Sequence, residues 1–161
     1  MKHLPKHVRP RWRYLAVGIE TWPGASLSRG AFQREAWYAA QNLLGDAGSA
    51  DADVTVVRFS HAAGAGEAAV RARRDEVDAT RAALACLDAV DGTPVGLRVR
   101  GVSGTIRACE ERYLGRAGGI RDERDVVFGT DRRRGHARDG AVDIETPSGF
   151  VGATDADISD T

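Results

Sequence analysis

The stretch DVTVVRFSHAAGAGEAAVRARR, residues 53–74, holds two strand-like runs in direct succession. The first run, residues 53–60, is rich in valine and other residues that favour strands. The second run, residues 66–74, follows after a short loop that contains glycine. Two such runs joined by a short glycine-containing loop predict a β-hairpin.

Helical and strand-like spacings of apolar residues alternate on both sides of this hairpin. A strand over 13–20 and a helix over 29–44 precede it, and a helix over 75–90, a strand over 94–102 and a last helix over 103–115 follow it. The order β-α-β-β-α-β is the split βαβ arrangement of ferredoxin-like and RNA-recognition-motif (RRM-like) folds. The sequence therefore predicts an α+β fold, with an antiparallel sheet, two helices on one face, the other face open, and an extra C-terminal helix.

Residues at the predicted helix ends support these assignments. Ser28 and Thr105 stand where an N-cap is expected, and Gly45 and Gly115 stand just past the C-terminal ends. The first and the last helix therefore each carry a start signal and a stop signal.

The apolar periodicity stops after about residue 118. Val126, Val127 and Phe128 form the only compact apolar cluster in a stretch otherwise rich in Gly, Asp and Arg. Segments with few apolar residues and many charges do not bury enough surface to fold alone. We therefore expect a ferredoxin-like domain with a basic N-terminal arm over residues 1–118, and a disordered charged tail over residues 119–161.

The overall composition excludes several broad classes of protein. The chain has 161 residues and no net charge at pH 7, so it is not a uniformly basic nucleic-acid protein, although a local basic patch remains allowed. No apolar run reaches the roughly 18 residues of a membrane helix, and the start lacks the apolar stretch of a signal peptide. We expect a soluble, cytoplasmic protein.

Arg outnumbers Lys by 21 to 2, which fits either a GC-rich genome or a salt-loving host.

The first 13 residues carry basic side chains and no acidic ones. Lys6, Arg9, Arg11 and Arg13 lie around two prolines, which favour a semi-extended arm over a helix. Such an arm is suited to following a phosphate backbone, and an ordinary solvated terminus is the alternative.

Strand alternation predicts a second group of basic side chains on the open face of the sheet. With Val57 and Phe59 directed into the core, Val56 should face outward. The functional side chains expected on the open face are Arg58, Arg71, Arg73, Arg98 and Arg100, with the aromatic residues Trp12 and Tyr14. Guanidinium groups suit phosphate oxygens, and aromatic rings stack on unpaired bases. This face is predicted to bind RNA, although a solvated face or a face covered by a protein partner would give the same pattern.

The residues before the last helix form a third candidate site. The hydroxyls of Ser103 and Thr105 and the free N–H groups at a helix start can hold an anion, and Arg107 follows closely. Ordinary capping by the two hydroxyls is the alternative.

No catalytic or metal-binding motif stands out in the sequence. The four histidines lie in predicted loops or ends, and no zinc-protease, nucleophile-elbow or P-loop pattern is present. Cys86 and Cys109 lack His or Cys partners at ligand spacing, so we expect buried, reduced thiols. The sequence thus offers no catalytic residue and no metal site.

Four blocks of sequence carry a resemblance to a known family. They are KHLPKHVRPRWRYLAVGIE near the start, FQREAWYAAQNLLGDAGSA in the first helix, VVRFS in the second strand, and RVRGVSGTIRACEERYL around the last helix. Together they span residues 1–114 and resemble the archaeal ribonuclease P protein component 2 family. The tail from residue 119 departs from the compact family pattern.

The resemblance implies the same split βαβ fold and a function in tRNA processing. Family members are subunits of a ribonucleoprotein that removes the 5′ leader from precursor tRNA. Its RNA subunit holds Mg²⁺ and performs the hydrolysis, so the protein is a non-catalytic subunit that has no cofactor of its own and helps the catalytic RNA fold. The implied partners are the catalytic RNA, precursor tRNA as substrate of the complex, and protein component 3 with other ribonuclease P proteins. The resemblance also implies a complex with two copies of component 2 and two of component 3, and so a homodimer contact within a heterotetramer.

Two aromatic residues of the first helix are candidates for a protein contact. Trp37 and Tyr38 lie beside the apolar stripe of Phe32, Ala36 and Leu43 rather than within it. Adjacent large aromatics on a helix cannot both face the same core. We predict that one of them contacts a protein partner, and a broad buried face is the alternative.

Two other functions stay open. An independent single-stranded RNA-binding module of RRM type would carry aromatics on its central strands, where Tyr14 fits but Arg71 and Arg73 do not. A ferredoxin-like small-molecule-binding domain would need a polar pocket or a nucleophile, and neither is visible in the sequence.

Overall fold

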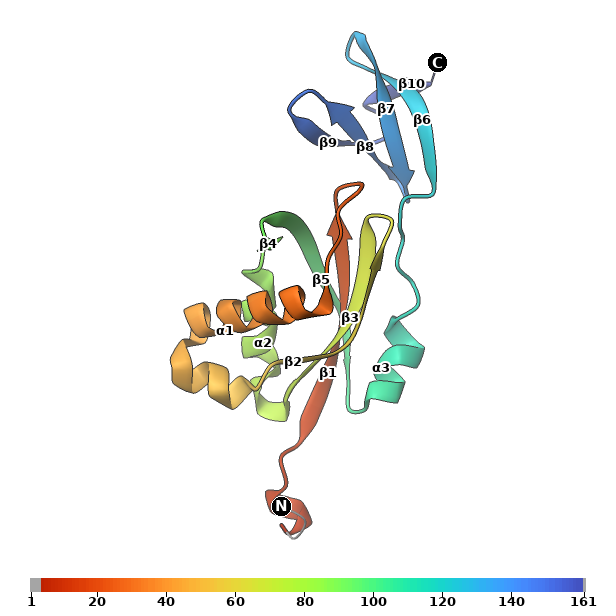
Figure 1. Cartoon of the computed structure of the whole chain (residues 1–161). Coiled ribbons are helices and arrows are strands. Elements are labelled where there is room, and N and C mark those ends of the chain that lie inside the picture. Colours follow the sequence, from red (N-terminus) through yellow and green to blue (C-terminus); the bar gives the residue numbers. More distant parts are fainter. Residues whose placement is uncertain (1–3, 161) are drawn as a thin grey trace.

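Strand β1 (Trp12–Thr21) lies in the middle of a five-stranded antiparallel sheet in the computed structural model, which describes residues 4–160. The other strands are β2 (Thr55–Ala62), β3 (Ala65–Arg73), β4 (Ala89–Val90) and β5 (Thr93–Ser103). Their order is β2-β3-β1-β5-β4 (Figure 1). This is the split βαβ order with one short strand added at an edge, so the predicted α+β fold is confirmed.

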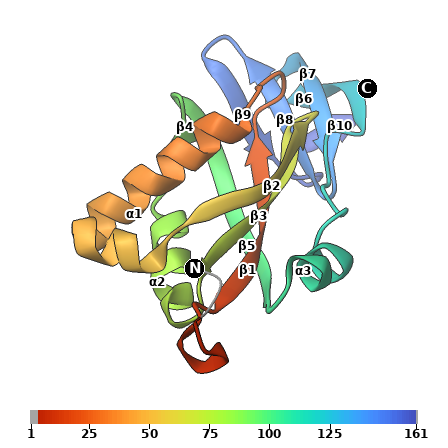
Figure 2. The ribbon, with the colours of Figure 1, turned by 60° about the horizontal axis from the view of Figure 1, so that its bottom comes forward.

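Helices α1 (Arg29–Ala52) and α2 (Val77–Ala85) cover one face of this sheet (Figure 2). Phe32 of α1 is fully buried there, and its ring centroid lies 5.5 Å from that of Phe59. The strand residues buried in the same core include Leu15, Val17, Ile19, Val56, Ala68, Val70 and Ala72. Two helices on one face are therefore present as predicted, and burial of their apolar stripes drives this packing.

Helix α3 (Ile106–Tyr113) packs on the opposite face of the sheet (Figure 2). Ala16, Ala69 and Cys109 form a second small core beneath it. The Tyr113 ring lies over Gly101, where a Cβ atom would collide with the ring, so glycine permits this close approach. The face predicted to be open is therefore covered at its centre, because the last helix folds back onto it.

The predicted helix caps are present. The Ser28 Oγ accepts from the N–H of Ala31, and the Thr105 Oγ1 accepts from the N–H of Ala108, each at 3.1 Å. Gly45 has a φ of 73°, the left-handed conformation expected where a helix ends. Helical turns resume beyond it, so α1 is longer than predicted and contains a kink.

The predicted helix over 75–90 is too long at its C-terminal end. Past α2 the chain turns at Asp91 and Gly92, both with positive φ, and β4 pairs with β5. Positive φ at both central residues is typical of a tight hairpin turn. Cys86 is therefore exposed beyond the helix end rather than buried, whereas Cys109 is buried as expected.

Strand β2 contains an irregularity that simple alternation does not anticipate. Its pairing with β3 shifts register between Val56 and Arg58, as at a β-bulge, where two residues oppose one on the partner strand. Val56 is consequently in the main core, and Val57 packs on the α3 side. The predicted directions of these two valines are wrong, whereas Phe59 faces the core as predicted.

Residues 122–160 form a second five-stranded antiparallel sheet, which differs from the disordered tail expected there. Its strands are β6 (Asp122–Phe128), β7 (Asp131–Arg138), β8 (Ala141–Thr146), β9 (Gly149–Ala153) and β10 (Ile158–Asp160). The order β10-β6-β7-β8-β9 brings the last strand back beside the first of the five. The core consists of Val126, Val142, Ile144 and Ala153, with no strand giving more than two of them. Local counts of apolar residues miss such a core because it exists only once the five strands pair.

The two sheets lie end to end, and the N-terminal arm is at the end remote from the second sheet (Figure 1). Arg138 of β7 reaches across the junction and donates to the carbonyl oxygens of Gly64 and Thr21 at 3.1 and 2.9 Å. The rings of Trp22 and Phe150 stack beside it with centroids 5.9 Å apart. These contacts join the second sheet to the end of β1 and to the β2–β3 turn. Among the described residues, no helix is long and apolar enough to cross a membrane.

Candidate nucleic-acid interface

The N-terminal arm folds against the end of the first sheet and builds a basic pocket there. The N–H of Arg74 donates to the carbonyl oxygen of Arg11 at 2.9 Å, which ties the arm to the short 3₁₀ helix η2 (Arg74–Glu76). The pocket has a volume of about 350 Å³ and is lined by His7, Arg9, Pro10, Arg11, Arg73, Arg74 and Asp75. We use the term basic end for these residues together with their neighbours Trp12, Arg13 and Arg71.

Two arginines of the basic end lie over an aromatic ring. The guanidinium carbons of Arg71 and Arg73 are 4.1 and 4.5 Å from the centroid of the Trp12 ring, within the range of cation–π attraction. Arg73 also reaches a carboxylate oxygen of Asp53 at 3.4 Å. Side chains fixed in this way present planar N–H donors in a defined direction, which suits phosphate oxygens.

The start of α3 adjoins the basic end. Arg13 donates from Nη1 to the carbonyl oxygen of Trp12 at 2.9 Å, and the same Nη1 lies 3.9 Å from the position a Cβ would take on Gly104. Ser103 is buried, and its Oγ has no hydrogen-bond partner among residues 4–160. A buried polar atom without a partner is costly, so this hydroxyl does not stabilise the start of α3.

Three other predicted residues do not line the pocket. Thr105 caps α3, so ordinary capping accounts for its hydroxyl. Arg107 is exposed and its Nε lies 2.7 Å from a carboxylate oxygen of Glu111, one turn further along the helix. Lys6 lies in the 3₁₀ helix η1 (Lys6–Val8), is exposed, and does not line the pocket.

The remaining residues predicted for the open face do not line the pocket of the basic end. The Arg58 Nε is 2.8 Å from a carboxylate oxygen of Glu110 in α3. Tyr14, the residue that fits the RRM-type alternative, is half-buried and packs against α3. Arg98 and Arg100 line a cleft at the other end of the sheet, beside the second sheet. Helix α3 thus divides the single face that strand alternation predicts.

Glu67 is a buried acid beneath Arg100. Its carboxylate pairs with the Arg100 guanidinium and accepts from the N–H groups of Gly115 and Arg116 at 2.7 and 2.8 Å. Burial raises the pKa of Glu67, but these backbone donors and the Arg100 charge outweigh burial and hold the pKa below its ordinary value. Glu67 therefore anchors the segment that leaves α3. A lone glutamate in a strand gives no sequence signal for this role.

Two basic residues of the basic end are missing from the candidate residues that the sequence indicates. Arg74 follows the end of β3, and His7 lies in the arm, yet both line the pocket. Their only sequence signal is proximity to other basic residues, because the pocket forms from segments more than 60 positions apart in the chain.

Helix α1 exposes the two aromatic residues predicted to contact a partner. The relative exposures of Trp37 and Tyr38 are 49% and 51%. The Trp37 Nε1–H donates to the carbonyl oxygen of Val54 at 2.7 Å, so this indole also has a role within the fold. A broad buried face is excluded for these side chains, and the contact with a partner stays a prediction.

The sequence model of the Rpp14/Pop5 family matches residues 13–114, which include both helical layers and all five strands of the first sheet. The chain belongs to the Rpp14/Pop5 family. A relative from Halorubrum lacusprofundi named ribonuclease P protein component 2 is 64% identical over 153 residues, which are 95% of this chain and 96% of the relative. A relative of the same name from Haloarcula marismortui is 58% identical over 160 residues, 98% of this chain and 99% of the relative. The resemblance to the component 2 family is thereby confirmed.

A solved structure is also similar to this Rpp14/Pop5 chain. It is a chain in the cryo-EM structure of yeast ribonuclease MRP, with a TM-score of 0.46 and 16% identity, over 62% of this chain and 79% of that chain.

The second sheet lies outside the Rpp14/Pop5 match. The family match ends at residue 114, whereas β6 begins at Asp122. The two relatives from Halorubrum and Haloarcula match over 95% and 98% of this chain, so their similarity extends into the second sheet. This sheet is therefore an addition to the Rpp14/Pop5 domain that reaches beyond the family match.

Proposed function

We propose that this chain is a protein subunit of the ribonuclease P ribonucleoprotein, and that its basic end binds and organises the catalytic RNA. Family membership and the names of the similar proteins support the assignment to ribonuclease P. The observation that carries the RNA contact is the convergence of Arg9, Arg11, Arg73 and Arg74 on one pocket.

The proposed role of the protein is electrostatic. The catalytic RNA must bring its own phosphates together around Mg²⁺ and precursor tRNA, and arginine side chains reduce their mutual repulsion. We assign the hydrolysis of the 5′ leader bond to the RNA subunit, with Mg²⁺ held by RNA, so the protein is a non-catalytic subunit. This role puts it in the cytoplasm with its substrate, precursor tRNA.

The proposed protein partners are component 3 and the other ribonuclease P proteins. Two copies of this chain would meet in a homodimer contact within a heterotetramer with component 3. The exposed surface around Trp37 and Tyr38 is the proposed site for a protein partner, because half-exposed aromatics are common anchors of protein interfaces.

A cleavage assay at low Mg²⁺ tests the proposed function. Precursor tRNA is incubated with the ribonuclease P RNA of the same organism, with and without this chain and component 3. We expect a large gain in cleavage rate that requires both proteins, and the absence of any gain would contradict the proposal.

A charge-matched pair of variants then tests the basic end. Arg11→Gln/Arg74→Gln removes two charges from the pocket, and Arg132→Gln/Arg134→Gln removes two from exposed positions of β7. We expect the first variant to need more Mg²⁺ for the same rate and the second to behave like the unaltered chain. Equal behaviour of the two variants would remove the basic end from the mechanism.

A further inference from the structure

We propose that the cleft between the two sheets is a second RNA site, which holds a phosphodiester of the same RNA, and that the second sheet exists to build it. This inference rests on the proposed function and adds a contact to it. The cleft has a volume of about 490 Å³. Four arginines line it: Arg98 and Arg100 of β5, Arg116 after α3, and Arg138 of β7.

Two of these arginines are fixed by buried acids. Arg138, with a side chain 9% exposed, pairs with Asp143, and it also donates to two carbonyl oxygens of the first sheet. Arg100 pairs with Glu67. These two pairs give the cleft rigid walls and leave little net charge of their own.

The other two arginines are free to meet a ligand. Arg98 and Arg116 are exposed, and their guanidinium groups have no ion-pair partner in the part of the chain that the structure describes. Glu67 accepts from the backbone N–H of Arg116 and so holds this residue at the rim. Two planar donor groups at the mouth of one cleft match the oxygens of a phosphodiester.

The acids facing the cleft leave a net positive charge. Asp139 lines it but lies 2.8 Å from a guanidinium nitrogen of Arg121. Glu20 is then the only lining acid without a basic partner among the described residues. Arg98 and Arg116 against Glu20 leave one excess positive charge, enough for one phosphodiester.

The second sheet is needed for this cleft. Arg138 and Asp139 come from β7 and its turn, beyond residue 114 where the family match ends. Without them, the cleft would be open on the side of the second sheet, and only the segment after α3 would lie beside Arg98 and Arg100. A site enclosed on two sides restricts the geometry of the bound phosphate. Such close contacts contribute more to binding than diffuse charge does when salt screens long-range attraction.

The position of the cleft favours the RNA that the basic end would bind. Trp12 and Gly18 lie on the same strand, one at the basic end and the other in the cleft. Six residues of a strand span about 20 Å. One RNA segment that runs past α3 can therefore reach both sites.

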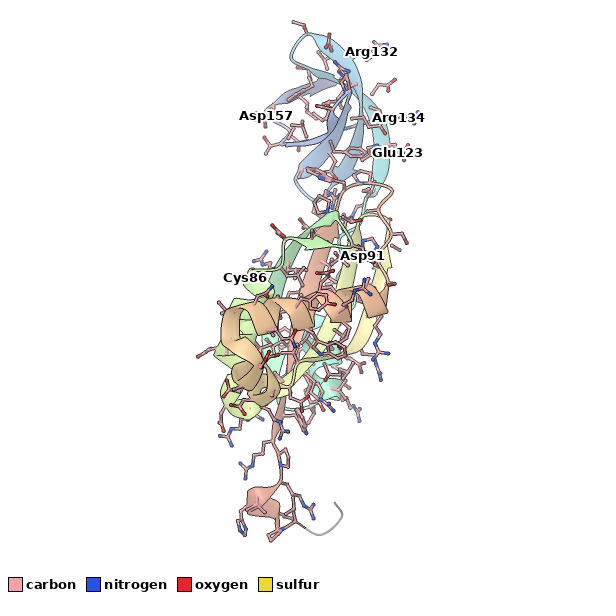
Figure 3. All side chains as sticks on the ribbon, turned by 60° about the vertical axis from the view of Figure 1, so that its left-hand side comes forward. Cys86, Asp91, Glu123, Arg132, Arg134 and Asp157 are labelled. Carbon is pink, nitrogen blue, oxygen red and sulfur yellow. The ribbon has the colours of Figure 1, made fainter. Side chains whose placement is uncertain are left out.

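The test uses the full chain and the ribonuclease P RNA of the same organism over a series of KCl concentrations. Arg98→Gln/Arg116→Gln is compared with Arg132→Gln/Arg134→Gln, which lie on the second sheet (Figure 3) and do not line the cleft. We expect the cleft variant to bind roughly tenfold more weakly, and its log–log salt dependence to be shallower by about 0.7–0.9. The β7 variant should leave both quantities unchanged.

The outcomes separate this inference from the proposed function. Weaker binding by Arg11→Gln/Arg74→Gln, with a cleft variant that equals the β7 variant, overturns the second site and leaves the basic end intact. No binding of the RNA by the unaltered chain or its complex overturns the proposed function itself. Titration with inorganic phosphate is the last arm: if the cleft variant loses phosphate binding but keeps its RNA salt dependence, the cleft is a small-anion pocket and the RNA site is overturned.

Discussion

Glu67 connects three parts of the fold through one carboxylate. It lies on β3, pairs with Arg100 of β5, and accepts from the N–H groups of Gly115 and Arg116 after α3. Each of these donors favours the ionised carboxylate, which is why the pKa of Glu67 lies below its ordinary value despite burial. Its charge is therefore a source of stability rather than a strain on the core.

Replacement of Glu67 tests this role through its pH dependence. A carboxylate with a lowered pKa in the folded state stabilises the fold fully above its unfolded-state pKa, and that stability disappears as pH falls through the folded-state pKa. We expect Glu67→Gln to lower the free energy of unfolding by about 2 kcal/mol at pH 7. The difference in unfolding free energy from the unaltered chain should narrow below about pH 4.5. Thermal unfolding at several pH values and fixed salt measures this. A difference that stays constant with pH would contradict it.

Gly101 decides how closely α3 can approach the sheet. A Cβ at this position would collide with the Tyr113 ring, whereas a Cβ on Gly96 of the same strand would meet its nearest neighbour at an ordinary 3.9 Å. We expect Gly101→Ala to destabilise the fold by about 1–3 kcal/mol and Gly96→Ala to have little effect. Denaturant unfolding compares the two. Equal stabilities would mean that α3 shifts away without loss.

Helix α3 divides the sheet face on which it lies into two separate surfaces. The rows of arginine that strand alternation predicts are real, but α3 takes up Arg58 and Tyr14 and separates the basic end from the cleft. The helix is short, so it depends on its cap and on the contacts of Cys109 and Tyr113 with the sheet.

Loss of the α3 cap should therefore have a measurable effect. Thr105→Ala removes the oxygen that accepts from the N–H of Ala108, and we expect a loss of about 1 kcal/mol in unfolding free energy. Thr105→Ser keeps a capping oxygen and serves as the control. If the serine variant loses as much stability as the alanine variant, the cap is not what the hydroxyl supplies.

Of the two exposed aromatic residues of helix α1, Tyr38 gives the cleaner test of the proposed partner surface. Trp37 donates to the carbonyl of Val54, so its removal also disturbs the edge of β2. No hydrogen bond of the Tyr38 side chain is found within residues 4–160. We expect Tyr38→Ala to weaken the complex with component 3 at least tenfold while the melting temperature stays unchanged. Calorimetric binding checks this, and unchanged affinity would move the interface elsewhere.

At the scale of the whole molecule, the junction between the sheets depends on Arg138. Its side chain is 9% exposed, pairs with the equally buried Asp143, and reaches two carbonyl oxygens of the first sheet. Removal of one partner of a buried ion pair leaves the other charge uncompensated. Truncation of the Arg138 side chain alone should therefore destabilise the junction between the two sheets.

Two variants separate the ion pair from the junction. We expect Arg138→Gln to cost about 3–5 kcal/mol and to make the segment before β6 susceptible to limited proteolysis. Arg138→Gln/Asp143→Asn should recover part of the stability, because no buried charge remains unpaired, but not the protection from proteolysis. Full protection in both variants would show that the stacked rings of Trp22 and Phe150 suffice.

The choice of arginine over lysine belongs to the same scale. Arg outnumbers Lys by 21 to 2 in the whole chain, and bidentate guanidinium contacts are less dependent on diffuse charge than ammonium contacts. We expect Arg→Lys replacement at Arg9, Arg11, Arg73 and Arg74 to weaken RNA binding more at high KCl than at low KCl. Equal affinity of the lysine variant at high salt would contradict this explanation.

Local patterns in the sequence determined four of the five strands of the first sheet and their order along the chain, whereas β4 lies within the helix predicted over 75–90. Strand alternation, helical spacing, the Ser28 and Thr105 caps and the hairpin over 53–74 all depend on neighbours within a few positions, which a single sequence displays directly. The resemblance over residues 1–114 was also visible in contiguous blocks, and it supplied the family.

Only the tertiary structure decided which of these residues act together. The bulge beside Val57, the return of α3 onto the sheet, and the pocket shared by Arg11 and Arg74 arise from contacts between distant segments. The second sheet is the clearest case, because no strand in it supplies more than two core residues, and its stability comes from strand pairing and from Arg138 at the junction. Long-range pairing and burial have no fixed spacing along the chain. The sequence pattern therefore predicts the helices and strands, and only the folded structure shows which of their faces are buried or meet.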